Sequence, residues 1–141
     1  MLPKLRIVYR SLLILVSFFF LLQSVEAQDS TAKKPSSKSK IQYGIASFYS
    51  NKFNGRKTAN GEVFSQKKLT AAHNSLPLGT YVRVTNLRNK KKVIVKVNDR
   101  LHHRNKRVID LTRAAAQSLG FIKAGTTRVK IEVLGKKPPL N

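Results

Sequence analysis

The 141-residue sequence contains no cysteine and no tryptophan, and it has only six acidic residues against 28 lysines and arginines. Without cysteine the chain has no disulfide framework, no zinc–thiolate site, no cysteine nucleophile and no acylated cysteine anchor. The shortage of acids confines any carboxylate chemistry to six side chains. These are Glu26, Asp29, Glu62, Asp99, Asp110 and Glu132.

The charge and the hydrophobic content bound the class of protein. The length allows about one domain, and a hydrophobic fraction of 41% excludes a wholly disordered basic polyelectrolyte. The formal net charge of +22 points to a polyanionic partner, for which nucleic acid is the default expectation.

Residues 1–27 have the layout of a secretory signal peptide: a basic start, an uncharged apolar run at 11–22, and the small residue Ala27 at the cleavage point. The alternative is an uncleaved membrane anchor, but a spanning helix needs about 20 apolar residues and this run is shorter. Cleavage removes three bases and one acid and leaves a net charge of +20. We therefore expect an exported protein that is not inserted in a membrane after cleavage. Its positive charge is expected to bind anionic polymers of the cell envelope and not nucleic acid.

Composition divides the remaining chain into three parts. Residues 28–40 are rich in serine and lysine and have no large apolar side chain, which predicts a flexible linker. Residues 41–134 form one small globular domain without an internal repeat, and residues 135–141 are expected to be a disordered tail.

Alternating apolar and polar residues predict strands over 81–85, 93–97 and 127–133, with shorter strands over 45–49 and 108–111. In the three long strands, valine and isoleucine occupy the face that we expect to be buried.

The connecting segments complete this prediction. Residues 86–92 are expected to form a hairpin loop, and one helix is predicted over 113–119, with Asp110 or Thr112 as its N-cap and Gly120 at its end. Short strands with one short helix predict a small closed β-barrel, because closure removes exposed sheet edges.

Asp99 is the most interesting of the four acids in the globular part. It continues the parity of the inward residues of 93–97, so we expect its side chain on the buried face of that strand. Burial would favour the protonated form that a general acid needs, whereas Lys96 and Arg100 favour the carboxylate. The alternative is a turn in which Asp99 pairs with Arg100.

The other three acids have simpler interpretations. Glu62 follows a turn at Asn60-Gly61 that directs it into a cleft or leaves it on a surface turn. Asp110 is expected to cap the helix, and Glu132 to be a solvated charge on a strand.

The histidines do not form a recognisable metal site. His73 lies in an uncharged run, where a lone histidine is usually a hydrogen-bonded structural residue. His102 and His103 stand in a basic run without cysteine or acid, so we expect a cationic loop that contacts anionic or sugar groups and no metal.

Seven short motifs along residues 43–134 closely resemble the rare lipoprotein A (RlpA) family of septal lytic transglycosylases. In order they are Gly44-Ile-Ala-Ser-Phe-Tyr49, Phe53-Asn-Gly-Arg-Lys-Thr-Ala-Asn-Gly-Glu62, Leu69-Thr-Ala-Ala-His73, Leu76-Pro-Leu-Gly79, Val82-Arg-Val-Thr-Asn-Leu87, Val97-Asn-Asp-Arg100 and Arg107-Val-Ile-Asp-Leu111. The resemblance implies a mainly β fold, a six-stranded double-psi β-barrel with one or two short helices, related to the expansins.

The resemblance also implies an activity: endolytic cleavage of MurNAc–GlcNAc bonds in peptidoglycan, with formation of 1,6-anhydro-MurNAc and a preference for strands stripped of stem peptides. No metal or cofactor is required. The family's functional acids correspond to Asp99, which we assign as the general acid and base, and Glu62, which would orient substrate or stabilise positive charge. The expected substrate-binding residues are His73, Arg100, Asn98 and Thr58.

The chain departs from the family in three ways. Leu101-His102-His103 replaces the usual Gly-Pro-Phe beside Asp99, the sequence lacks the lipid-carrying cysteine of many relatives, and we expect no septal-targeting SPOR domain. We therefore expect a soluble protein of the periplasm or cell envelope and do not carry over septal localisation.

Two other functions are compatible with the sequence. One is a non-catalytic, expansin-like protein that binds or loosens wall glycan, although the absence of tryptophan platforms favours the enzyme. The other is polyanion binding by charge alone, which salt would abolish and which would be indifferent to Asp99.

Overall fold

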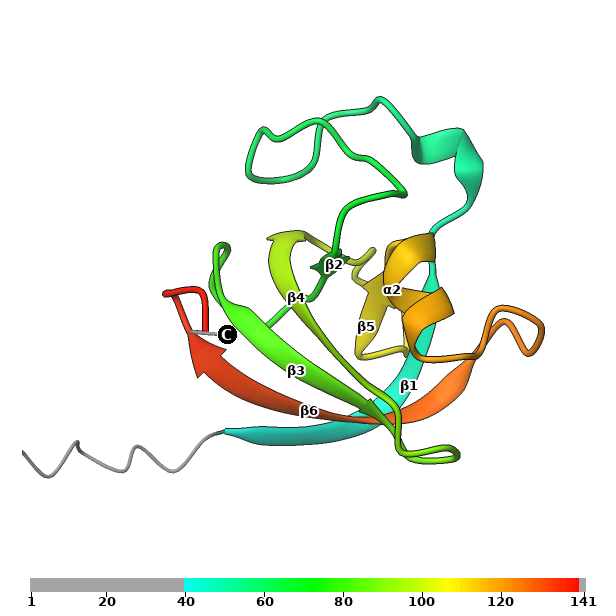
Figure 1. The fold of residues 1–141 in the computed structure, drawn as a ribbon. Helices are drawn as coiled ribbons and strands as arrows, with labels where there is room; N and C mark the ends of the chain where they lie inside the picture. Colours follow the sequence, from blue (N-terminus) through cyan, green and yellow to red (C-terminus); the bar gives the residue numbers. More distant parts are fainter. Residues whose placement is uncertain (1–39, 140–141) are drawn as a thin grey trace, which may run out of the picture. The chain divides into compact units, whose positions relative to one another are not determined.

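The computed structural model describes residues 40–139, and in them six strands close into a barrel in the order β1-β5-β2-β4-β3-β6 (Figure 1). The strands are β1 (Ile41–Phe48), β2 (Thr70–Ala72), β3 (Tyr81–Asn86), β4 (Lys92–Asp99), β5 (Ile109–Leu111) and β6 (Thr127–Gly135). A single short helix, α2 (Arg113–Ser118), and one 3-10 turn (Asn51–Phe53) complete the described part. The predicted mainly β, six-stranded barrel is confirmed.

The barrel mixes parallel and antiparallel pairs. β1 pairs with β5, and β2 with β4, in parallel, whereas the long strands β3, β4, β6 and β1 are joined antiparallel. In the barrel β5 lies between β1 and β2, and β2 lies between β4 and β5, so the segments that join β1 to β2 and β4 to β5 each cross a neighbouring strand. The first of these loops carries several residues of the site.

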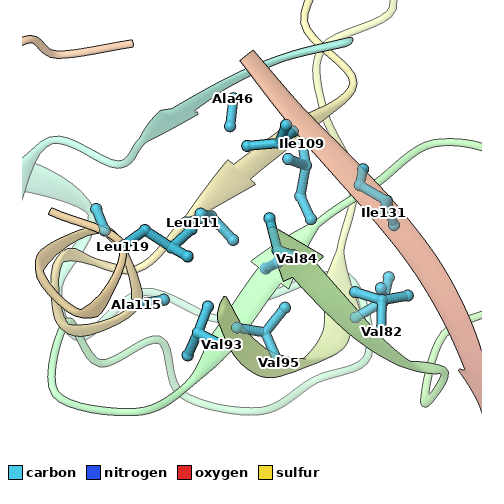
Figure 2. Close-up of a cluster of buried hydrophobic side chains, with 14 of the residues drawn as sticks. Ala46, Val82, Val84, Val93, Val95, Ile109, Leu111, Ala115, Leu119 and Ile131 are labelled. Carbon is cyan, nitrogen blue, oxygen red and sulfur yellow. The ribbon is translucent and has the colours of Figure 1, made fainter. Parts of the chain in front are cut away.

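The core lies inside the barrel and beneath α2 (Figure 2). The inward residues are mostly valines of β3 and β4, such as Val84 and Val95, which face Ile109, Leu111 and Ile131 across the interior. Burying each such side chain stabilises the fold by about 1.5–3 kcal/mol. The interior is closed by Ala115 and Ala116 of the helix and by its C-cap residue Leu119, all of which are fully buried.

The predicted strands and the hairpin at 86–92 are confirmed, since Thr85 pairs with Lys92 across it. The strand β2 was not predicted, because its three residues are all buried and too few to show alternation. The proposed capping role of Asp110 is wrong. Thr112 is the N-cap residue, without a side-chain bond, and Asp110 lies in β5, where other groups bind its carboxylate.

The predicted signal peptide, residues 1–27, and nearly all of the predicted linker lie outside the described residues. Within 40–139, no helix is long and apolar enough to cross a membrane.

Candidate active site

Asp99 ends β4 at a β-bulge. Against the neighbouring strand β2, Ala71 pairs with Val97 and Ala72 with Asp99, so Asn98 is an extra residue in the register. A bulge interrupts the alternation of faces. The predicted placement of Asp99 on the inward face is therefore wrong: Asn98 is 3% exposed, whereas Asp99 is partly exposed at the end of the barrel.

The carboxyl group of Asp99 is held by three donors. The Tyr49 hydroxyl donates to Oδ2 over 2.8 Å, and the backbone N–H groups of Ala59 and Arg100 donate to Oδ1 over 3.0 and 2.8 Å. The expected pairing with Arg100 therefore involves its backbone, while its guanidinium donates to the His73 carbonyl over 2.6 Å. Oδ2, with a single donor, is the oxygen left to exchange a proton with a ligand.

Tyr49 is a neutral donor to this carboxyl group. Burial first, and then the hydrogen bond to Asp99, raises the pKa of Tyr49 far above its ordinary value of 10.0. Its ring is packed against Phe64 and Phe53, with centroid distances of 4.5 and 5.9 Å. The aromatic contacts fix the ring, so the hydroxyl reaches Asp99 from a defined direction.

Glu62 contacts Asn98, the residue that precedes Asp99. Its Oε1 accepts a bond of 2.6 Å from Lys96 Nζ and its Oε2 a bond of 3.0 Å from Asn98 Nδ2. These contacts, Lys96 first, lower the pKa of Glu62 from 4.5 to about 2. Glu62 is therefore a carboxylate at any working pH.

The loop that carries Glu62 is attached to the end of β4. Asn60 N–H donates to the Asn98 carbonyl over 3.1 Å, and the Thr58 hydroxyl donates to Asn60 Oδ1 over 2.7 Å. Gly61 has φ of 87°, a conformation that glycine adopts without strain. The turn predicted at Asn60-Gly61 is present, and it points Glu62 toward Lys96 and Asn98.

His73 lies beneath the site. It is 1% exposed, its Nε2 lies 2.9 Å from Gln42 Oε1, and its Nδ1 accepts N–H bonds from Ser75 and Leu76, both 3.2 Å long. Nδ1 must be unprotonated to accept them, so the ring is neutral. Burial lowers its pKa below 6.5, in agreement with this tautomer.

A cavity of about 570 Å³ opens in front of Asp99. Its lining residues are Phe48, Tyr49, Ser50, Lys52, Phe53, Ala72, Asp99, Arg100, Leu101, His102, Asn105, Arg107 and Asp110. Neither His73 nor Glu62 is among them. The Leu101-His102-His103 departure thus contributes one buried residue, Leu101 at 7% exposure, and one ring, His102, to the cavity wall.

Asp110 is the second acid of this cavity. Arg107 donates to both of its oxygens, over 2.8 and 3.2 Å, and the Ser47 hydroxyl donates over 2.6 Å. Tyr49, Arg107 and Asp110 were not predicted to be site residues. Tyr49 belongs to the Gly44-Ile-Ala-Ser-Phe-Tyr49 motif, but its place at the end of a predicted strand, 50 residues before Asp99, gave no sign that the two side chains are in contact.

The described residues hold no cluster of three histidine or acidic side chains that could bind a metal ion. His102 and His103 stack on each other, with ring centroids 4.3 Å apart.

The fold is similar to that of an expansin from Clavibacter michiganensis, with a TM-score of 0.58 and 21% identity, over 72% of this chain and 53% of that one. Among curated proteins, an endolytic peptidoglycan transglycosylase RlpA of Pasteurella multocida is 47% identical over 118 residues, which are 84% of this chain and 40% of the relative. The corresponding protein of Haemophilus influenzae is 50% identical over 79% of this chain and 39% of its own length.

The chain thus spans about two fifths of the length of these relatives. The model of the lytic transglycolase family matches residues 41–131, which include the whole barrel up to the middle of β6. The chain therefore belongs to the RlpA-like, double-psi β-barrel family of lytic transglycolases.

Proposed function

We propose that this protein is an exported endolytic transglycosylase of the cell envelope that cleaves MurNAc–GlcNAc bonds in peptidoglycan glycan strands, with a preference for strands stripped of stem peptides. The observation that carries the proposal is the Asp99 carboxyl group, held by three donors at the edge of a 570 Å³ cavity with Oδ2 available to a ligand. The names of the relatives support the substrate and the reaction class.

One carboxyl group is sufficient for this reaction. Protonated Asp99 gives its proton to the glycosidic oxygen as the bond to C1 of MurNAc breaks. The C6 hydroxyl of the same sugar then attacks C1, and its proton returns to Asp99. Because the nucleophile belongs to the substrate, no second residue has to activate water.

Glu62 supplies negative charge in this scheme. With a pKa of about 2 it cannot act as a general acid near neutral pH. Since Glu62 does not line the cavity at Asp99, its fixed carboxylate would favour the positive charge of an oxocarbenium-like transition state from outside that cavity. Its bonds to Lys96 and Asn98 hold it in place.

The remaining predicted site residues have positioning roles. The backbone N–H of His73 donates to the backbone carbonyl of Asp99 over 3.1 Å, and the backbone carbonyl of His73 accepts a hydrogen bond from the Arg100 guanidinium. Thr58 and Asn98 hold the Glu62 loop against β4. We assign these four residues to the support of Asp99 and Glu62, with Arg100 also exposed to the cavity.

The decisive experiment incubates the protein with amidase-stripped glycan strands and identifies the products by mass spectrometry. We expect 1,6-anhydro-MurNAc ends, and we expect Asp99→Asn to reduce their formation by about 10²–10⁴-fold, the usual contribution of a general acid or base.

Two results would contradict the proposal. Ordinary reducing ends would mean hydrolysis, with Glu62 or Asp110 as the first candidate to activate water. Binding of the strands without any product would favour the non-catalytic, expansin-like alternative.

A further inference from the structure

A second concave surface lies at the opposite end of β4 from Asp99. A cleft of about 640 Å³ is lined by Ile45, Leu87, Arg88, Thr126, Thr127 and Arg128, beside the hairpin that joins β3 to β4. Asp99 ends the eight-residue strand β4 and the hairpin stands at its other end, so the two are about 25 Å apart. Figure 1 shows the hairpin and the loop after β1 at opposite ends of the barrel.

The cleft continues onto the outer face of β1 and β6. Strand pairing places Ile45 opposite Arg128 and Tyr43 opposite Lys130, so these side chains are cross-strand neighbours. Tyr43 is 62% exposed and Ile45 39% exposed, although both are large apolar residues. We define these five residues, Tyr43, Ile45, Arg88, Arg128 and Lys130, as the distal surface.

Positive charge is concentrated on and around the distal surface. β1, β6 and residues 87–92 carry six bases, Arg88, Lys90, Lys91, Lys92, Arg128 and Lys130. The same segments contain one acid, Glu132, which lies 3.3 Å from Lys130 Nζ. Among the described residues, neither Arg88 nor Arg128 forms an ion pair, and both are exposed.

We infer that the distal surface is a second binding site for an anionic polysaccharide strand, separate from the cavity at Asp99. Two unpaired guanidinium groups can each bind a carboxylate through paired hydrogen bonds. Tyr43 offers an exposed ring on which the apolar face of a sugar can pack, at little cost in side-chain entropy.

The identity of the polymer rests on the proposed function. A glycan strand held about 25 Å from Asp99 raises the effective concentration of the same strand at the catalytic cavity. A membrane surface is a poorer match, because peripheral membrane binding inserts a broad apolar face, and only Ile41, Tyr43 and Ile45 are exposed along β1.

The test uses the full chain carrying Asp99→Asn, so that cleavage cannot alter binding. Sedimentation with insoluble, amidase-stripped glycan strands compares Arg88→Glu/Arg128→Glu with Lys67→Glu/Lys68→Glu, a matched reversal of two exposed lysines before β2. We expect the first pair to raise the dissociation constant at least about tenfold and the second less than about threefold. Tyr43→Ala, which leaves the charge unchanged, should also weaken binding.

If both double variants lose glycan binding equally, the overall charge of the protein and not the distal surface determines binding. If the arginine variant loses no binding, the distal surface does not bind glycan. Both overturn the inference. So would an arginine variant that loses binding to vesicles containing phosphatidylglycerol but keeps binding to glycan. If the charge reversals unfold the protein, as circular dichroism would reveal, Arg88→Gln/Arg128→Gln replaces them. A wild-type protein without transglycosylase activity would leave this comparison intact, because it measures binding only.

A second readout uses chain length. In the active protein, which keeps its native Asp99, Arg88→Glu/Arg128→Glu should slow the cleavage of long strands. The cleavage of oligosaccharides shorter than about 25 Å should stay unchanged. A parallel loss on both substrates would place the two arginines in the catalytic site and overturn the separation of the two surfaces.

Discussion

The Asp99 carboxyl group has unequal oxygens because its three donors are distributed unequally. Oδ1 accepts two backbone N–H groups, which cannot move away without displacing the chain, whereas Oδ2 accepts only the Tyr49 hydroxyl. Tyr49 therefore controls the orientation of the group that we assign as the general acid.

Replacing Tyr49 by phenylalanine tests this control. Loss of the hydroxyl leaves Oδ2 without its protein donor, so the carboxyl group loses its fixed orientation and the turnover number on glycan strands should fall about tenfold, as expected for the loss of a hydrogen bond to a charged group. The control is Tyr43→Phe, since the Tyr43 side chain lies on the other surface, and an unchanged turnover number in Tyr49→Phe would refute the role.

The ionisation of Glu62 can be measured directly. Its folded-state pKa of about 2 is below the ordinary 4.5, so its contribution to stability is present above pH 4.5 and is lost as the pH falls through 2. Lys96→Met removes the hydrogen bond that contributes most to the lowered pKa of Glu62. An NMR titration of the Glu62 carboxyl carbon should show its pKa moving back toward 4.5. Both side chains are about one-third exposed, so the cost in unfolding free energy should stay below about 1 kcal/mol.

The matched control for this measurement is Lys92→Met, which removes an exposed base from the same strand at its other end. A Glu62 titration that moves equally in both variants would mean that general charge, and not the 2.6 Å contact, lowers the pKa.

Elements of the barrel meet at distances that leave no room for some side chains. β1 lies beside β5 so closely that a Cβ at Gly44 would be 2.3 Å from Val108 Cγ1. Valine is β-branched and its χ1 angle is stiff, so it cannot turn away cheaply.

We therefore expect Gly44→Ala to lower the free energy of unfolding by about 1–3 kcal/mol in a denaturant titration, as overpacked sites usually do. Adding Val108→Ala should restore most of the loss, because it removes the two methyl groups in the way. A double variant as unstable as the sum of the two single ones would contradict the steric explanation.

The whole molecule combines a net charge of +22 with a closed barrel of long-range strand pairs. Mutual repulsion among so many bases opposes the compact state, and salt screens it over a Debye length of about 10 Å at 0.1 M. Raising sodium chloride from about 0.02 M to about 0.3 M should therefore raise the midpoint of thermal unfolding. A falling midpoint would show that ion pairs such as Lys96–Glu62 outweigh the repulsion.

Local sequence patterns determined much of the fold. The long strands β3, β4 and β6 were predictable because their inward residues alternate, and the hairpin and helix followed from their position and punctuation. The candidate acids were also predictable, since the chain has so few. β2 was not, because a buried three-residue strand has no period.

What the tertiary structure decided is the environment of each acid. The bulge at Asn98 reversed the expected face of Asp99, a donor 50 residues away bound its Oδ2, and Lys96 and Asn98 fixed Glu62 as a carboxylate. Asp110 changed from a helix cap to a partner of Arg107. Alternation and composition report on neighbours along the chain, whereas ionisation and hydrogen bonding depend on neighbours across the barrel, and only closure of the sheet brings those together.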